Sequence, residues 1–254
     1  MLKEITQACQ YLLYNFPGAE PIREYLDSRL TRESQKKFNF GYYPNSNDLS
    51  ILIDLVGEEI LKKNELLYYW GIEDSMAPRN ILISYFEHYP LVMPFKNAYG
   101  HQVGLVARTM LSDEERKPLK IPKYKNTKDF KKGNVLFGLY ENKKEILDLN
   151  QVYIVEGQFD AIKSNEIGMK NVVAIGNAMM TTYQFSVISR YTNNIILLLD
   201  NDQAGEKGRK AIINKFGKLA NIQNFYIPKE YKDIDEYITK EQISDFAQIS
   251  FSAE

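Results

Sequence analysis

Strand-like and helix-like segments alternate through the C-terminal half of the chain, and this alternation constrains the fold more than any other feature. Apolar, β-branched runs occupy 151–155, 171–175, 195–199 and 222–227. Helix-like segments fill the intervals at 158–167, 182–190 and 204–216. Short apolar runs that alternate with helices are typical of a parallel sheet covered by helices. We therefore expect an α/β domain in this part of the chain.

Two of the strand-like segments end on carboxylates. Glu156 follows the first segment, and Asp200 and Asp202 follow the third. In open α/β sheets, ligand sites form beyond the carboxyl ends of the strands, so these three residues should converge at one edge. No basic residue adjoins them in the sequence, and crowded carboxylates repel one another unless a cation lies among them. Oxygen-only ligands favour Mg²⁺ or Mn²⁺.

A second acidic pair, Asp233 and Asp235, follows the last strand-like segment and is a candidate source of further metal ligands. The ordinary interpretation of an isolated Asp-x-Asp motif is a capped helix start. Its occurrence together with Val-Glu-Gly, at two strand ends of one alternating pattern, is much harder to attribute to chance. For Asp233 and Asp235 themselves, both interpretations stay open.

The N-terminal half mixes both kinds of segment. Helices are expected at 1–30, with a break at 16–18 and a new start capped by Thr31, and at 49–70. Strands are expected at 81–86, 91–95 and 102–108, with a hairpin-like connection at 97–100. We therefore predict three regions: an α+β lobe with a small antiparallel sheet at 1–148, the α/β domain at 149–240 and a C-terminal tail at 241–254.

Positive charge gathers between Arg116 and Lys132, where eight basic residues face the single acid Asp129, although the formal net charge of the chain is −1. Such a run is usually a solvated surface. The alternative is a nucleic-acid contact, and the neighbouring motifs decide between the two.

Several classes of protein are excluded by what the chain lacks. Cys9 is the single cysteine, so a disulfide within the chain and a thiolate zinc site are both excluded. Two histidines, His88 and His101, are too few for an imidazole metal cluster. No apolar run approaches the ~20 residues of a membrane span, and the N-terminus lacks the pattern of a signal peptide. We expect a cytoplasmic protein with no zinc and no membrane contact.

Three motifs of the α/β region, in this order, resemble those of the TOPRIM domain. They are Val155-Glu156-Gly157-x-x-Asp160-Ala161, Ala174-Ile175-Gly176 and Asp200-Asn201-Asp202-Gln203-Ala204-Gly205. Topoisomerases, bacterial-type primases and some nucleases share that domain. The resemblance implies a TOPRIM parallel sheet flanked by helices.

The N-terminal half narrows the resemblance to the RNA-polymerase core of bacterial-type DNA primases. The segments that resemble its motifs, in the family's order, are 25–31, 38–44, 103–108, 122–127 and 130–140. This implies template-directed synthesis of short RNA primers on single-stranded DNA from ribonucleoside triphosphates, by metal-dependent nucleotidyl transfer.

The resemblance also implies roles for particular residues. Glu156, Asp200 and Asp202 would be catalytic and, with Asp233 and Asp235, would hold two or more Mg²⁺ or Mn²⁺ ions. Template, primer or triphosphate would be bound by Arg29, Arg108, Lys123, Tyr124, Asn126 and Lys132. Nucleic-acid phosphates favour this mixture of cations, amides and aromatic rings.

The chain departs from the family pattern in places. His88 and Pro90 stand where two arginines are usual, and Asn177, Met179 and Met180 replace threonines. The family's zinc module cannot be built from one cysteine. We expect the region beyond the TOPRIM motifs to be too short for the family's helicase-binding domain. We therefore expect template capture to need a replicative helicase or a separate template-recognition chain.

Two rival functions stay open on the sequence. One is a TOPRIM-type nuclease, which would use the same carboxylates to hydrolyse a phosphodiester. The other is a non-catalytic primase-like subunit that binds single-stranded DNA or a helicase.

Overall fold

The structure is a computed structural model that describes residues 2–72 and 79–253. The chain divides into two compact units. One comprises residues 1–95 with 102–130, and the other comprises residues 96–101 with 131–254. The three regions predicted from the sequence, which are 1–148, 149–240 and 241–254, stay a prediction.

The second unit is built on a five-stranded sheet of order β11-β10-β9-β7-β8. Its strands are β7 (Val152–Val155), β8 (Val172–Ala174), β9 (Asn194–Leu197), β10 (Asn221–Tyr226) and β11 (Ser252–Ala253). β7 pairs in parallel with both β8 and β9, and β10 pairs in parallel with β9. The predicted parallel sheet is confirmed, and its four parallel strands, β7 to β10, fall within two residues of the expected positions.

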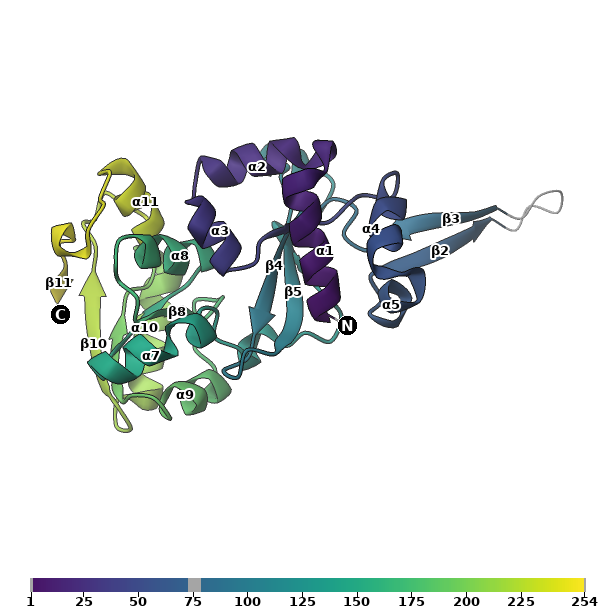
Figure 1. Ribbon diagram of the computed structural model, residues 1–254. Helices are drawn as coiled ribbons and strands as arrows, with labels where there is room; N and C mark the ends of the chain where they lie inside the picture. The colour runs from purple at the N-terminus through teal and green to yellow at the C-terminus, as the bar shows by residue number, and fades with distance from the viewer. Residues whose placement is uncertain (1, 73–78, 254) are drawn as a thin grey trace. The chain divides into compact units, whose positions relative to one another are not determined.

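Helices flank this sheet, as predicted. They are α7 (Leu139–Leu149), α8 (Gln158–Glu166), α9 (Thr182–Ile188), α10 (Gln203–Phe216) and α11 (Ile234–Lys240). α8 packs against α11 (Figure 1). Thr181 caps the start of α9, because its side chain accepts a hydrogen bond from the backbone N–H of Gln184. Among residues 2–72 and 79–253, no helix combines the length and apolarity that crossing a bilayer requires.

The core of this unit lies between the sheet and its helices. Ile154, Val173 and Leu197 come from adjacent strands and are fully buried. The rings of Phe185 and Phe216 stack with centroids 4.2 Å apart. Burial of each such side chain contributes about 1.5–3 kcal/mol, so the strand ends that carry the carboxylates rest on a rigid base.

The C-terminal segment ends in a strand at the edge of the sheet. A short 3₁₀ helix (Phe246–Gln248) precedes β11, which pairs antiparallel with β10 at the edge of the sheet. The rings of Phe246 and Phe251 lie 6.0 and 6.1 Å from the ring of Tyr153. This segment covers the backbone groups of an otherwise open edge strand.

The first unit begins with the predicted helices. α1 (Leu2–Asn15) and α2 (Glu20–Asp27) are separated by a 3₁₀ turn at Pro17–Ala19, and α3 (Arg32–Lys37) is capped by Thr31. The sheet of this unit has the order β1-β4-β5-β6. Its strands are β1 (Gly41–Tyr42), β4 (Leu91–Lys96), β5 (Gln102–Arg108) and β6 (Tyr124–Asn126). α1 packs against β1 and β5, and the short α6 (Asp113–Arg116) follows β5.

The prediction of one helix over 49–70 is wrong in its second part. α4 (Leu49–Val56) and α5 (Glu58–Lys63) are separated by Gly57, whose φ of 90° breaks the helix. The chain then forms β2 (Leu67–Ile72), which pairs antiparallel with β3 (Arg79–Ser84). The run Leu-Leu-Tyr-Tyr-Trp favours a strand because aromatic side chains suit a pleated surface.

Candidate metal centre

Glu156 lies where β7 gives way to α8. The backbone N–H of Gly157 donates a 2.9 Å hydrogen bond to Oδ2 of Asp160, one turn into the helix. This bond fixes the start of α8 directly after the strand. The Glu156 side chain is therefore held at the carboxyl end of the sheet, where the parallel topology predicts a site.

Asp200 lies beside Glu156, although 44 residues separate them in the sequence. Leu198 continues the ladder past the end of β9, because its N–H donates to the Ile154 carbonyl at 2.8 Å. Two residues later, the N–H of Asp200 donates to Oε1 of Glu156 at 3.3 Å. The structure thus places the backbone of Asp200 against the carboxylate of Glu156, and the charges of both Asp200 and Asp202 act on that carboxylate.

The electrostatics of this pair reflect burial and like charge. Burial, with a smaller contribution from the charge of Asp200, raises the pKa of Glu156 to about 7. Burial also raises the pKa of Asp200, against the opposing effect of Lys232. It costs free energy to keep these carboxylates ionised together, and a bound divalent cation would offset this cost.

Asp202 takes the structural role that an isolated Asp-x-Asp suggests. It is exposed, and its Oδ1 accepts hydrogen bonds from the N–H groups of Ala204 and Gly205 at 2.8 and 2.9 Å, so it caps α10. The cap orients this carboxylate at the same strand end as Asp200. A role for Asp202 in metal binding stays a prediction.

The second acidic pair lies beside Asp160, which is not among the ligands predicted from the sequence. One carboxylate oxygen from each of Asp160, Asp233 and Asp235 lies within 4.8 Å of the other two. Burial raises the pKa of Asp160 well above its usual range, and the charge of Asp233 adds to the effect. Asp160 is part of the motif Val155-Glu156-Gly157-x-x-Asp160-Ala161. Because it is distant in sequence from Asp233, the sequence does not predict their contact.

Lys232 links the two groups of carboxylates and was also missed. Its Nζ lies 3.0 Å from Oδ2 of Asp200 and 3.5 Å from Oδ2 of Asp233. Partial burial opposes the charge on this amine, but its pairing with Asp200 and Asp233 outweighs that effect and raises its pKa. The lysine therefore supplies positive charge where the sequence around Glu156 and Asp200 has none.

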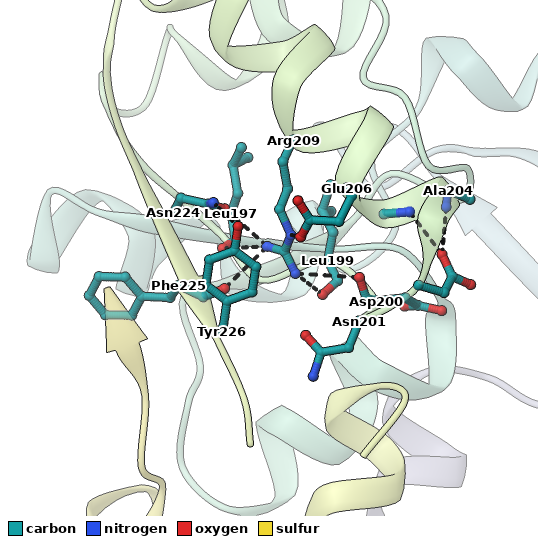
Figure 2. A network of polar contacts seen from close by, with 12 residues as sticks. Leu197, Leu199, Asp200, Asn201, Ala204, Glu206, Arg209, Asn224, Phe225 and Tyr226 are labelled. Atoms are coloured by element: carbon teal, nitrogen blue, oxygen red, sulfur yellow. Dashed lines mark hydrogen bonds and ion pairs between the residues drawn. The ribbon is translucent and has the colours of Figure 1, made fainter. Parts of the chain in front are cut away.

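Oxygen donors from three strand ends suit a hard divalent cation, so the side chains present fit the metal that the sequence predicts. Behind them, α10 approaches the strand ends closely. A Cβ on Gly205 would lie 2.1 Å from the carbonyl oxygen of Asp200, so glycine is required at this contact. Figure 2 shows Arg209, on the same helix, directed at the backbone around Leu199 and Asp200.

The predicted nucleic-acid residues of the first unit gather around β5 and β6. The guanidinium of Arg108 lies 4.7 Å from the ring centroid of Tyr25, and that of Arg29 lies 5.9 Å from the same ring. A hollow of about 300 Å³ is lined in part by Tyr25, Arg108 and Lys123. Lys123 is exposed, with its amine 5.8 Å from the Tyr124 ring. The structure thus groups these basic and aromatic side chains.

Asn126 and Lys132 are positioned by other contacts. The carbonyl oxygen of Asn126 accepts a 2.8 Å hydrogen bond from the hydroxyl of Tyr85. Lys132 belongs to the second unit, where it is half-buried and its aliphatic chain lies against Gly176. Burial lowers the pKa of its amine.

Two family models match the chain. The Toprim-like family matches residues 153–238, and the N-terminal domain of the DNA primase catalytic core matches residues 10–143. The second match covers more than half of the chain, so the chain belongs to the DNA primase catalytic core family.

Curated relatives and solved structures agree with this assignment. The chain is 33% identical to a DNA primase of Aquifex aeolicus over 240 residues and 34% identical to one of Thermotoga maritima over 227 residues. These alignments cover 92% and 88% of this chain but only 45% and 38% of the relatives, so the chain spans less than half of their length.

Among solved structures, the zinc-binding and RNA polymerase domains of the Aquifex aeolicus primase match with a TM-score of 0.71 at 28% identity. That match covers 98% of this chain and 60% of the other. A DnaG primase catalytic domain solved bound to single-stranded DNA shares the fold, with a TM-score of 0.69 at 23% identity. It covers 94% of this chain and 78% of the other.

Proposed function

We propose that this chain is a DNA primase core that synthesises short RNA primers on a single-stranded DNA template from ribonucleoside triphosphates. The observation that carries the proposal is the contact of Glu156 with Asp200 at the carboxyl edge of a TOPRIM-like sheet. The family membership of the N-terminal half supports a primase over other TOPRIM proteins.

The catalytic residues in this proposal are Glu156, Asp200 and Asp202, and the metal ligands are these three with Asp233 and Asp235. To this set we add Asp160, because its carboxylate lies within 4.8 Å of those of Asp233 and Asp235. Bound Mg²⁺ or Mn²⁺, in two or more positions, would neutralise triphosphate charge and activate a primer hydroxyl. The carboxylates would hold the metal ions in place beside the reacting groups.

The basic residues of the first unit would bind the nucleic acid and the nucleotide. Arg29, Arg108 and Lys123 offer cations beside aromatic rings, Tyr124 and Asn126 share one strand with Lys125, and Lys132 lies in the second unit. Phosphates are bound by such cations and amides, and bases stack on such rings. A protein that shares this fold was solved bound to single-stranded DNA.

A primer-synthesis assay tests the proposal. Purified protein with single-stranded DNA, ribonucleoside triphosphates and Mn²⁺ should form short RNA products, and the Asp200→Asn variant should form none. Since the substitution removes one of several repelling carboxylates, we expect the melting temperature of the metal-free protein to change little. Unaltered synthesis by Asp200→Asn would refute the assignment.

The same assay separates the rival functions. Cleavage of labelled RNA or DNA with metal but without nucleotides would identify a nuclease. Binding of single-stranded DNA without Mn²⁺ binding would identify a non-catalytic subunit. A cognate replicative helicase, or another template-recognition chain, should increase primer yield, because His88 and Pro90 stand where the family usually has two arginines.

A further inference from the structure

Arg209 is a charged side chain in the interior of the second unit, only 1% exposed. Arginine is almost never fully buried unless it is paired. Its nearest carboxylate is that of Glu206, with Oε1 3.3 Å from Nε. Glu206 is 43% exposed on its side chain, and the contact lacks hydrogen-bond geometry at Nε. The ion pair alone therefore does not account for the burial.

The guanidinium is held instead by backbone carbonyls at the ends of two strands (Figure 2). Nη2 donates to the carbonyl oxygens of Leu199 and Asp200, the second at 3.4 Å. Nη1 donates to Oδ1 of Asn224 at 3.0 Å and to the carbonyl of Phe225 at 3.2 Å. One face of the guanidinium lies 4.3 Å from the ring centroid of Tyr226.

The bond to Leu199 has a specific consequence for the acidic site. The carbonyl of Leu199 and the N–H of Asp200 belong to the same peptide group. Its oxygen accepts from Arg209, and its N–H donates to the carboxylate of Glu156. A hydrogen bond at one end of a peptide polarises the group and strengthens the bond at the other end. The buried charge of Arg209 is thus relayed to Glu156 through one peptide.

We propose that Arg209 is a positioning residue for the metal centre, which fixes and polarises the 199–200 peptide so that Glu156 and Asp200 are held together as ligands. This inference rests on the proposed metal site and adds a residue to it. Burial lowers the pKa of Arg209, and the charges of Glu156 and Asp200 are among those that oppose this effect.

A merely structural role would be to tie β9 to β10 through Asn224 and Phe225. The Asn224→Ala variant isolates that role, because it removes a contact of Arg209 to β10 and leaves the bond to Leu199 in place. Arg209→Lys keeps a cation but loses the separate contacts that Nη1 and Nη2 make. Arg209→Met removes the charge as well.

The experiment measures Mn²⁺ binding by isothermal titration calorimetry in the full chain, together with the melting temperature of the metal-free protein. Arg209→Met should weaken Mn²⁺ binding roughly tenfold or more, the usual scale for a residue that supports metal ligands, and Arg209→Lys should weaken it by an intermediate factor. Asn224→Ala should lower the melting temperature and leave the Mn²⁺ affinity within about twofold.

Arg209→Lys is the deciding variant if Arg209→Met does not fold, since it retains a buried cation. Affinity of Arg209→Lys equal to the wild type, or weakened no more than in Asn224→Ala, would overturn the inference while leaving the proposed function intact. Failure of the wild type to bind Mn²⁺ would instead overturn the proposed metal site itself.

Discussion

Lys232 places its amine 3.0 Å from the carboxylate of Asp200, across 32 residues of sequence. The same amine lies 3.5 Å from Asp233, so one cation bridges the two acidic groups of the site. It links the loop after β9 to the loop before α11. The acidic side chains are thus one electrostatic unit whose charge is only partly balanced by the protein.

Replacement of this lysine should expose that imbalance. Lys232→Met should lower the stability of the metal-free protein by about 1 kcal/mol, the upper end for a partly exposed pair. Mn²⁺ should restore part of the loss. Thermal melting with and without Mn²⁺ measures both effects, and Lys229→Met, at an exposed position nearby, is the matched control. Equal melting temperatures for the two variants would show that Lys232 does not stabilise the site.

Glu156 should make the metal-free protein less stable as the pH rises. Burial raises its pKa from 4.5 to about 7. Between those values the folded state binds more protons than the unfolded state, so the free energy of unfolding falls as pH increases through this window. Glu156→Gln removes the contribution of this residue to the pH dependence. The gain in melting temperature of Glu156→Gln over the wild type, measured with a chelator present, should therefore grow from pH 5 to pH 7.5. A gain that is constant with pH would contradict the raised pKa.

Gly205 should be intolerant of any side chain. A Cβ at this position would meet the carbonyl oxygen of Asp200 at 2.1 Å, so Gly205→Ala forces α10 away from the loop that carries Asp200. We expect a destabilisation of about 1–3 kcal/mol from the overpacking, although alanine favours helices by about 1 kcal/mol over glycine. Chemical denaturation measures it. Ala204→Ser, at the exposed neighbouring position, should change stability by no more than about 0.5 kcal/mol. A Gly205→Ala protein as stable as this control would show that the close approach is not required.

Lys123 should contribute to single-stranded DNA binding through charge. If the basic residues around β5 and β6 engage about 5 phosphates, the logarithm of the affinity should fall against the logarithm of salt concentration with a slope near −3.5. Lys123→Gln should weaken binding and reduce the magnitude of that slope by about 0.7. Fluorescence anisotropy with a labelled oligonucleotide measures both. Lys144→Gln removes the same charge from an exposed lysine paired with Asp148, and it should leave the slope unchanged. Identical slopes for the two variants would show that Lys123 is a solvated surface residue that does not bind DNA phosphate.

The sequence predicts the features of this molecule that depend on periodicity. The alternation of segments after residue 150 predicts β7 to β10 and α8 to α10, and parallel topology then places Glu156 near Asp200. Periodicity does not predict the pairing of β2 with β3, because the aromatic run follows a helix directly and has no hydrophobic period that separates it from the helix. Pattern also cannot show contacts between side chains distant in sequence, such as that of Asp160 with Asp233 and that of Lys232 with Asp200.

The burial of Arg209 is a further feature that the sequence does not predict. An arginine on an amphipathic helix is ordinarily interpreted as solvent-exposed, and no local signal distinguishes one that turns inward. Its burial follows from the carbonyls at the ends of β9 and β10, which come together only in the folded sheet. Polar contacts of this kind require coordinates.

Calorimetric titration of the wild type, Glu156→Gln and Asp200→Asn with Mn²⁺ tests the central claim most directly. The wild type should bind Mn²⁺, and each variant should lose roughly tenfold or more in affinity, in the range for loss of a residue on which a metal site depends. Both variants should keep the metal-free melting temperature of the wild type or exceed it. Unchanged Mn²⁺ affinity in both variants would contradict the claim that these two carboxylates form one metal centre.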